Sequence, residues 1–380
     1  MPSKMIPVFL IFIFLVLVIL LGGHYLVYKG FITAFQINNP NVASVLKSIY
    51  GFLAISYVLG LLIAHWSENF FTRTFYFMTA AWLGTSLYIA FAVILGKLVY
   101  WLTGLADIDL SLGFITAFLI GAALFYSGYG IWNAFTPGIK KIEVAIKNLP
   151  QAWQGKMAVQ ISDVHLGHIH GKRFLHDIIT RVNSVNPSIV LITGDLFDGM
   201  GGNFGYIVDE LNRITAPQGI YYIIGNHETY MNFKGVLPIL AKTQLKILRD
   251  QAVTIDGLQI IGADYPEPGQ KRDITKALAL VNHDLPSILL WHEPIRIKEA
   301  KESNISLMLS GHTHHGQLWP FGLISRLAYK KYHTGLHSEG DFSIYTSIGA
   351  GTWGPPMRTG NKPEIVAITL RAKINIKAPT

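Results

Sequence analysis

The sequence contains no cysteine and few charged residues. Of its 380 residues none is Cys, and Asp, Glu, Lys and Arg together make up only 14%, whereas soluble domains carry about 25%. The lack of cysteine excludes disulfide frameworks, thiolate metal sites and cysteine nucleophiles. Disorder is excluded as well, because 51% of the residues are hydrophobic and disorder requires few apolar residues and much charge. The composition therefore disfavours a protein that is wholly surrounded by water.

The sequence also lacks a cluster of like charges. The formal net charge of +8 is divided equally between the parts of the chain before and after residue 150. Proteins that bind nucleic acids gather their basic residues on one face or stripe. A dispersed excess of this size supports only mild attraction to anionic surfaces, so we expect no nucleic-acid partner.

Four long stretches without any charged side chain lie in the first 136 residues. They cover residues 6–28, 48–67, 74–96 and 110–136. Each is long enough to cross the hydrocarbon core of a bilayer, which takes about 20 helical residues. Four such stretches predict a four-span α-helical membrane domain over residues 1–137. The first apolar run is too long for a typical signal peptide and lacks a typical cleavage site, so we expect it to remain as a span.

Basic residues near the spans predict the orientation of the chain. Four spans place both termini on the same side of the membrane. If that side is cytoplasmic, five Lys and Arg residues flank the spans inside and three flank them outside. The positive-inside rule then favours a multi-pass protein of the inner (plasma) membrane whose C-terminal domain is cytoplasmic.

Short apolar runs alternate with helix-compatible segments from residue 156 onward. The runs predict strands at residues 157–162, 189–193, 220–224, 287–290 and 305–309. Predicted helices lie at residues 172–184, 207–213 and 274–280. This alternation predicts an α/β domain over residues 138–380. At residues 139–147 both strand and helix periods fit, and the β-branched residues there favour a strand.

Polar clusters follow five of the apolar runs. They are Asp163-Val164-His165, Gly194-Asp195, Gly225-Asn226-His227-Glu228, Trp291-His292-Glu293 and Gly311-His312-Thr313-His314. Ligands bind outside the carboxyl ends of the strands in open α/β sheets. In extended backbone the side chains of residues i and i+2 point to the same face. The Asp-x-His and His-x-His pairs can therefore converge on one point.

The ordered set of clusters resembles the calcineurin-like metallophosphoesterases. Over about residues 157–370 the pattern Asp-x-His, Gly-Asp, Gly-Asn-His-Asp/Glu, His and Gly-His-x-His is complete. The strings at residues 162–167, 319–321 and 351–356 are similar to membrane-associated bacterial members, which are linked with phosphodiester or pyrophosphate lipid substrates and include UDP-diacylglucosamine hydrolases. The resemblance implies an α/β/β/α sandwich. His315 and Ile348 depart from the pattern, where glycine and arginine are common, whereas the ligand strings are complete.

The resemblance implies two divalent metal ions per chain. One ion would be held by Asp163, His165, Asp195 and His314, and the other by Asp195, Asn226, His292 and His312. Oxygen and imidazole ligands without thiolate suit Mn²⁺, Fe or Zn²⁺, and we expect Mn²⁺ first. His227 is not a ligand in the pattern, and we assign it as the general acid. Glu228 either supports a ligand or is a solvated residue.

The implied reaction is the hydrolysis of a phosphodiester or pyrophosphate, for which we expect a lipid-linked substrate and a membrane lipid as partner. Trp319 and Phe321 could form an apolar lip and His168 could contact the phosphate, although packing and loop roles fit these residues too. Two alternatives stay open: a membrane-tethered nucleotide phosphodiesterase, and an inactive membrane scaffold or sensor. The complete ligand set argues against a scaffold, and spans without internal charge argue against a transporter. The sequence predicts no oligomeric state.

Overall fold

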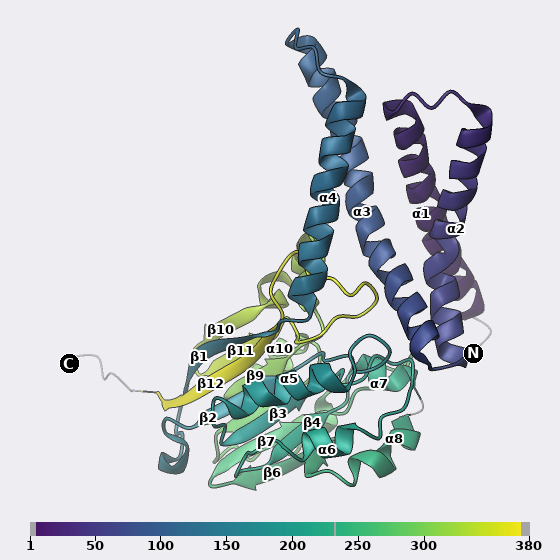
Figure 1. Cartoon of the computed structure of the whole chain (residues 1–380). Helices are drawn as coiled ribbons and strands as arrows, with labels where there is room; N and C mark the ends of the chain where they lie inside the picture. The colour runs from purple at the N-terminus through teal and green to yellow at the C-terminus, as the bar shows by residue number, and fades with distance from the viewer. Residues whose placement is uncertain (1–4, 232, 374–380) are drawn as a thin grey trace. The chain divides into compact units, whose positions relative to one another are not determined.

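The computed structural model describes residues 5–231 and 233–373, which form two compact units. One unit consists of helices and ends at Trp132, with residues 354–357 added to it. Its helices are α1 (Met5–Ala34), α2 (Pro40–Trp66), α3 (Phe70–Leu105) and α4 (Leu112–Ala134) (Figure 1). Each of the four is long and apolar enough to cross a membrane. Four long apolar helices are thus present, as the charge-free stretches predict.

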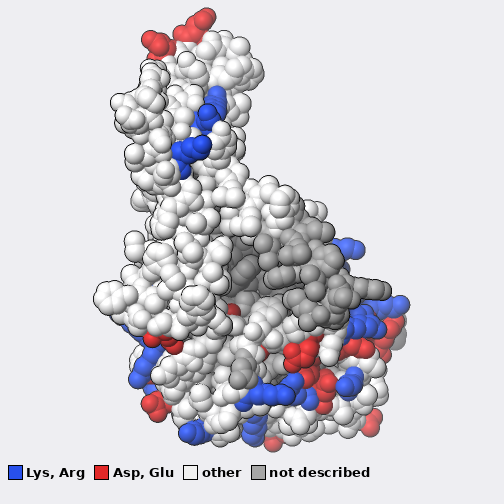
Figure 2. Space-filling view, turned by 90° about the vertical axis from the view of Figure 1, so that its right-hand side faces the viewer, with Lys and Arg blue, Asp and Glu red and all other residues white. Residues whose placement is uncertain are grey.

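Polar residues define where two of these helices begin. Asn39 caps α2 by accepting hydrogen bonds from the backbone N–H groups of Asn41 and Val42. Asn69 and Thr72 form a reciprocal capping box at the start of α3. Such caps satisfy N–H groups that have no partner inside the helix. Figure 2 shows that charged side chains gather over the α/β unit, whereas the helical unit is mostly free of them.

The second unit contains two six-stranded sheets. The first sheet has, in spatial order, β1 (Gly138–Ile146), β12 (Glu364–Ala372), β2 (Met157–Ile161), β3 (Ile189–Thr193), β4 (Ile220–Ile223) and β5 (Leu245–Ile247). The second has β10 (Gly335–Glu339), β11 (Phe342–Thr346), β9 (Leu307–Ser310), β8 (Ser287–Leu290), β7 (Leu258–Gly262) and β6 (Gln251–Ile255). All six segments for which the sequence favours a strand form one of these strands.

Helices accompany the sheets of the second unit. They are α5 (Lys172–Asn183), α6 (Ile207–Leu211), α7 (Asn226–Tyr230), α8 (Phe233–Leu240), α9 (Thr275–Leu278), α10 (Ile297–Glu302) and α11 (Gly322–Tyr329). The three predicted helices correspond to α5, α6 and α9.

Alternation along the strands builds two apolar cores. Leu191 of β3 joins a core with Leu290 of β8, so this core lies between the two sheets. The neighbours Val190 and Ile192 point to the opposite face and join a core that contains Ile178 of α5. This period of two residues is what a strand buried on both faces requires. The predicted sandwich of helices, sheet, sheet and helices is confirmed.

Parallel pairing sets the position of the site. Strands β2, β3 and β4 are parallel neighbours in the first sheet, and β8 and β9 are parallel neighbours in the second. The carboxyl ends of parallel neighbours lie at one edge of their sheet. The loops that follow these five strands carry the five polar clusters.

Candidate metal centre

Every predicted metal-ligating residue lies shortly after the end of a strand, most of them in loops, with Asn226 at the start of α7 and His314 at the start of a 3-10 turn. The relevant strands are β2, β3, β4, β8 and β9. Five of the residues have a left-handed backbone with φ between 47° and 72°: Asp163, His165, Asp195, His312 and His314. Positive φ is uncommon for residues other than glycine. Strain of this kind persists where the surrounding structure fixes a residue, and it concentrates at functional sites.

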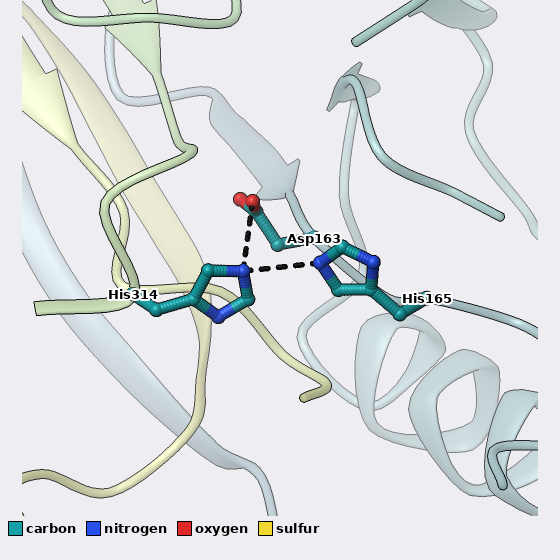
Figure 3. A group of neighbouring side chains, drawn as sticks. All are labelled: Asp163, His165 and His314. Atoms are coloured by element: carbon teal, nitrogen blue, oxygen red, sulfur yellow. Dashed lines mark hydrogen bonds and ion pairs between the residues drawn. The ribbon is translucent and has the colours of Figure 1, made fainter. Parts of the chain in front are cut away.

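Asp163, His165 and His314 form the first cluster (Figure 3). The Nε2 atom of His314 lies 3.3 Å from Oδ1 of Asp163 and 3.0 Å from Nε2 of His165. All three side chains are buried. Two imidazole nitrogens that face each other compete for a single proton, so this arrangement suits a shared cation.

Asp195, Asn226, His292 and His312 form the second cluster. The Nε2 atom of His292 lies 3.1 Å from Oδ2 of Asp195 and 3.0 Å from Oδ1 of Asn226. His312 approaches the same amide oxygen through Nδ1, at 2.8 Å. Carboxylate, amide oxygen and imidazole nitrogen therefore converge on one point.

Asp195 belongs to both clusters. Its Oδ2 atom lies 3.9 Å from Nε2 of His165 in the first cluster and 3.1 Å from Nε2 of His292 in the second. Its Oδ1 atom accepts a hydrogen bond of 2.9 Å from the backbone N–H of His227. One carboxylate can thus serve two adjacent cation sites.

The electrostatics of the clusters favour positive charge. Burial alone raises the pKa of Asp163, but the charge and hydrogen bond of His314 bring it well below its usual range. Burial lowers the pKa of His292, yet the neighbouring carboxylates of Asp195 and Asp163 outweigh burial and raise it to about 10. Two carboxylates that stay ionised in a buried site create the field that a divalent cation requires.

Comparison with known proteins gives the family. The family model of calcineurin-like phosphoesterases matches residues 158–316. An uncharacterized metallophosphoesterase from Campylobacter jejuni is 34% identical to this chain over 311 residues, which cover 80% of this chain and 79% of that protein. This chain belongs to the calcineurin-like metallophosphoesterases.

Two further relatives support the assignment of this metallophosphoesterase. An uncharacterized metallophosphoesterase from Helicobacter pylori is 35% identical over 276 residues, with 70% of this chain and 71% of that protein covered. A transmembrane protein with a metallophosphoesterase domain from Danio rerio is 32% identical over 275 residues, with 68% and 62% covered. The chain is therefore a metal-dependent phosphoester hydrolase with donors for two divalent ions, and its four apolar helices indicate a membrane protein.

His227 lies beside both clusters of the metallophosphoesterase. Its ring centroid is 4.5 Å from that of His165, and it offers a nitrogen within 4.8 Å of donor atoms of His165 and Asp195. The Nδ1 atom lies 2.7 Å from the backbone carbonyl oxygen of Asp198. Because a carbonyl can only accept, Nδ1 carries a proton, and Nε2 is the nitrogen available for a substrate.

Glu228 holds the loops of the centre through hydrogen bonds and is not a solvated residue. Its side chain is fully buried and accepts hydrogen bonds from the backbone N–H groups of Asp195 (3.0 Å), Phe197 (3.0 Å) and Gly225 (2.6 Å). These bonds tie the loop after β3 to the loop after β4. Burial and the charge of Asp195 raise the pKa of Glu228 to about 7.

Glu293 was part of a predicted cluster but had no predicted role. Its Oε1 atom lies 3.4 Å from Nε2 of His312 and accepts a 2.7 Å hydrogen bond from the hydroxyl of Tyr265. Arg272 pairs with its other oxygen at 3.1 Å. A carboxylate that contacts one ring nitrogen of a histidine fixes the ring so that the other nitrogen, here Nδ1, faces the metal site.

Arg358 is a buried residue that the sequence analysis missed. Its Nη2 atom lies 2.8 Å from Nδ1 of His314, and its Nη1 atom donates to the side chain of Asn361 at 2.7 Å. Arg358 follows His314 by 44 residues, and it is not part of any local motif, so only the fold reveals the contact.

Three further residues were predicted as substrate contacts. His168 is buried, and its backbone N–H lies 3.4 Å from a carboxylate oxygen of Asp198. Trp319 and Phe321 are exposed. The roles of these three residues stay predictions.

Proposed function

We propose that this metallophosphoesterase hydrolyses a phosphodiester or pyrophosphate bond in a lipid-linked substrate at the membrane. The main support for a reaction with two metal ions is the position of the Asp195 carboxylate, which approaches His165 of one cluster and His292 of the other. In this proposal one ion is held by Asp163, His165, Asp195 and His314, and the other by Asp195, Asn226, His292 and His312. When bound, two divalent ions neutralise phosphoryl charge and lower the pKa of the attacking water. Mn²⁺ is the ion that we propose first.

His227 supplies the proton to the leaving group in this proposal. Its Nδ1–H bond to the carbonyl of Asp198 orients the ring, and its backbone N–H bond to Asp195 fixes it next to the shared carboxylate. When the ring carries a proton on both nitrogens, Nε2 can donate its proton to the oxygen that departs from phosphorus, which leaves the neutral ring with its proton on Nδ1. General acid catalysis of this kind contributes about 10²–10⁴-fold.

Exposed aromatic side chains support a lipid-linked substrate. Trp319 and Phe321 follow the loop of His312 and His314 and are exposed. Trp353 is exposed too, and its ring centroid lies 6.2 Å from that of His227. Apolar side chains around a polar centre provide contacts for alkyl chains while the phosphate meets the ligands. One spanning helix already anchors a domain, so four exceed the need for a tether.

A nucleotide substrate is the second candidate. Tyr230 is exposed, and its ring centroid lies 5.4 Å from that of His227. Together with Trp353 it offers an aromatic ring on which a base could stack. Tyr230 and Trp353 thus fit a tethered nucleotide phosphodiesterase.

The test uses the full chain in lipid nanodiscs with Mn²⁺. We expect hydrolysis of a diacylated pyrophosphate such as UDP-diacylglucosamine to exceed that of nucleotide diesters. Trp319→Ala should lower kcat/KM for the lipid about tenfold, which corresponds to about 1.4 kcal/mol, and leave bis(p-nitrophenyl) phosphate unaffected. Leu280→Ala, an exposed apolar residue of the same unit, is the matched control. Nucleotide diesters as the better substrates throughout would replace the lipid proposal with the second candidate.

A further inference from the structure

Helix α11 presents its apolar side chains outward. Leu323, Ile324 and Leu327 are 64%, 61% and 81% exposed, whereas Ser325 is buried and Tyr329 is half-buried. A helix on the surface of a soluble domain turns its apolar stripe to the core and its polar residues to water. In α11 three large apolar side chains face outward instead, which favours apolar surroundings for its outer face.

Two exposed aromatic residues directly precede the exposed apolar residues of α11 in the sequence. Leu323 and Leu327 are four residues apart and therefore lie on the same side of the helix, next to Ile324. Trp319 and Phe321 precede the helix and are exposed as well. We call this set, Trp319, Phe321, Leu323, Ile324 and Leu327, the α11 surface.

Positive charge borders the α11 surface. Arg326 lies within the helix and Lys330 directly after it, and both are exposed. Helices that lie in the membrane interface combine Trp, Phe and Leu on one side with Lys and Arg that reach anionic headgroups. The long arms of Arg and Lys let the charge stay in the headgroup region while the neighbouring side chains enter the apolar region.

The connection between the last long apolar helix and the first strand is short. Helix α4 ends at Ala134 and strand β1 begins at Gly138, so residues 135–137 are the whole connection. Three residues span about 10 Å when extended. Strand β1 therefore begins within about 10 Å of the end of α4, a helix long and apolar enough to cross a membrane.

We infer that the α11 surface inserts shallowly into the lipid interface of the membrane that anchors the chain. Membrane docking in this sense does not depend on the identity of the substrate. Its consequence for catalysis rests on the proposed function.

Helix α11 adjoins the metal centre, because the ring of Tyr329 lies 6.1 Å from that of His312, and Gly316 of the ligand loop packs against Phe321 and Gly322. Docking of α11 thus holds the metal centre at the level of headgroup phosphates.

The absence of cysteine makes the docking measurable in the full chain. Leu327→Cys and Lys298→Cys each introduce the sole thiol, which is labelled with the fluorophore NBD. Lys298 lies on α10 in the same unit and is exposed. In nanodiscs that contain anionic lipids we expect blue-shifted NBD emission at position 327 and quenching by lipids with a nitroxide near the top of the acyl chain. The label at position 298 should emit as in water and escape quenching.

Two results would overturn the inference. One is a label at position 327 that emits as in water, and the other is a blue shift without quenching, which would show that protein, such as a second copy of the chain, covers α11. A separate arm measures turnover. Leu327→Asp should lower hydrolysis of a membrane-embedded lipid substrate about tenfold and leave bis(p-nitrophenyl) phosphate unchanged. Failure of the proposed lipid substrate would leave the fluorescence result intact, so the two proposals can fail separately.

Discussion

The ring of His227 is held by the backbone carbonyl of Asp198 and its main-chain N–H by the carboxylate of Asp195, and because it is not a proposed ligand its role can be tested separately. The His227→Ala variant should keep both metal ions, because the proposed ligands remain, and lose about 10²–10⁴-fold in turnover. The loss should be smaller for p-nitrophenyl esters, whose leaving group needs no proton. Metal content and kcat for substrates of graded leaving-group pKa provide the measurement. An equal loss for good and poor leaving groups would contradict the assignment as general acid.

Glu293 offers a test of how the protein orients a ligand. Glu293→Gln removes the negative charge 3.4 Å from Nε2 of His312 at nearly constant size. Partners behind a ligating histidine typically contribute about 10–100-fold in metal affinity, so we expect a loss of that size, measured by titration of the metal-free protein with Mn²⁺. Saturating Mn²⁺ should restore most of the turnover. Glu299→Gln, at a carboxylate on α10, is the control, and equal affinity in both variants would refute the role of Glu293.

At the scale of single residues the sequence reveals the proposed metal ligands but not the residues that orient them. Asp163 and His314 stand out because each follows an apolar run. Arg358 has no such signal, since its contact with His314 spans 44 residues and depends on how the chain returns to the site. Glu228 lies in one of the predicted clusters, but the sequence left open whether it supports a ligand or is solvated. Its burial decides between the two, and burial is a property of the fold that one residue cannot reveal.

At the scale of elements, the turn after β3 depends on a glycine. Gly194 has φ of +93°, and a Cβ atom there would lie 2.5 Å from Nδ1 of His292. Gly194→Ala should therefore strain the backbone and displace a proposed ligand. Gly335 has φ of +80° with nothing within 4 Å of an added Cβ atom, so Gly335→Ala measures the backbone cost alone. We expect Gly194→Ala to lower the free energy of unfolding by about 1–3 kcal/mol and to weaken Mn²⁺ binding, whereas Gly335→Ala leaves metal binding intact. Equal metal affinity in the two variants would contradict the account.

The elements that the sequence predicts are those with a strong local pattern. Strands β2, β3 and β4 are buried apolar runs that end in polar clusters, and α5 shows a clear amphipathic period. Strand β12 went unpredicted, although it pairs with both β1 and β2. Its partners lie more than 200 residues away, and long-range pairing leaves no periodic signal of its own in the sequence. Helix α11 also escaped prediction.

For the whole molecule, the distribution of basic residues predicts on which side of the membrane the α/β unit lies. If the termini are cytoplasmic, five Lys and Arg residues flank the spans on the inside and three on the outside, which predicts that the α/β unit is cytoplasmic. A reporter fused after Thr380 should therefore be active if it works only in the cytoplasm and silent if it requires export. Moving two lysines from the inner to the outer loops should weaken this preference. Activity of an exported reporter in the unaltered chain would show the opposite orientation.

The central claim is that one carboxylate, Asp195, joins two cation sites on which hydrolysis depends. The most direct measurement combines elemental analysis of the purified full chain with hydrolysis of bis(p-nitrophenyl) phosphate, for the unaltered protein, Asp195→Asn and the control Asp209→Asn. Asp209 is an exposed residue of α6. The account predicts two divalent ions per chain and Mn²⁺-dependent turnover in the unaltered protein and the control, with depleted metal and no turnover in Asp195→Asn at any Mn²⁺ concentration. Full turnover in Asp195→Asn, or an unaltered chain that hydrolyses the substrate without metal, would contradict it.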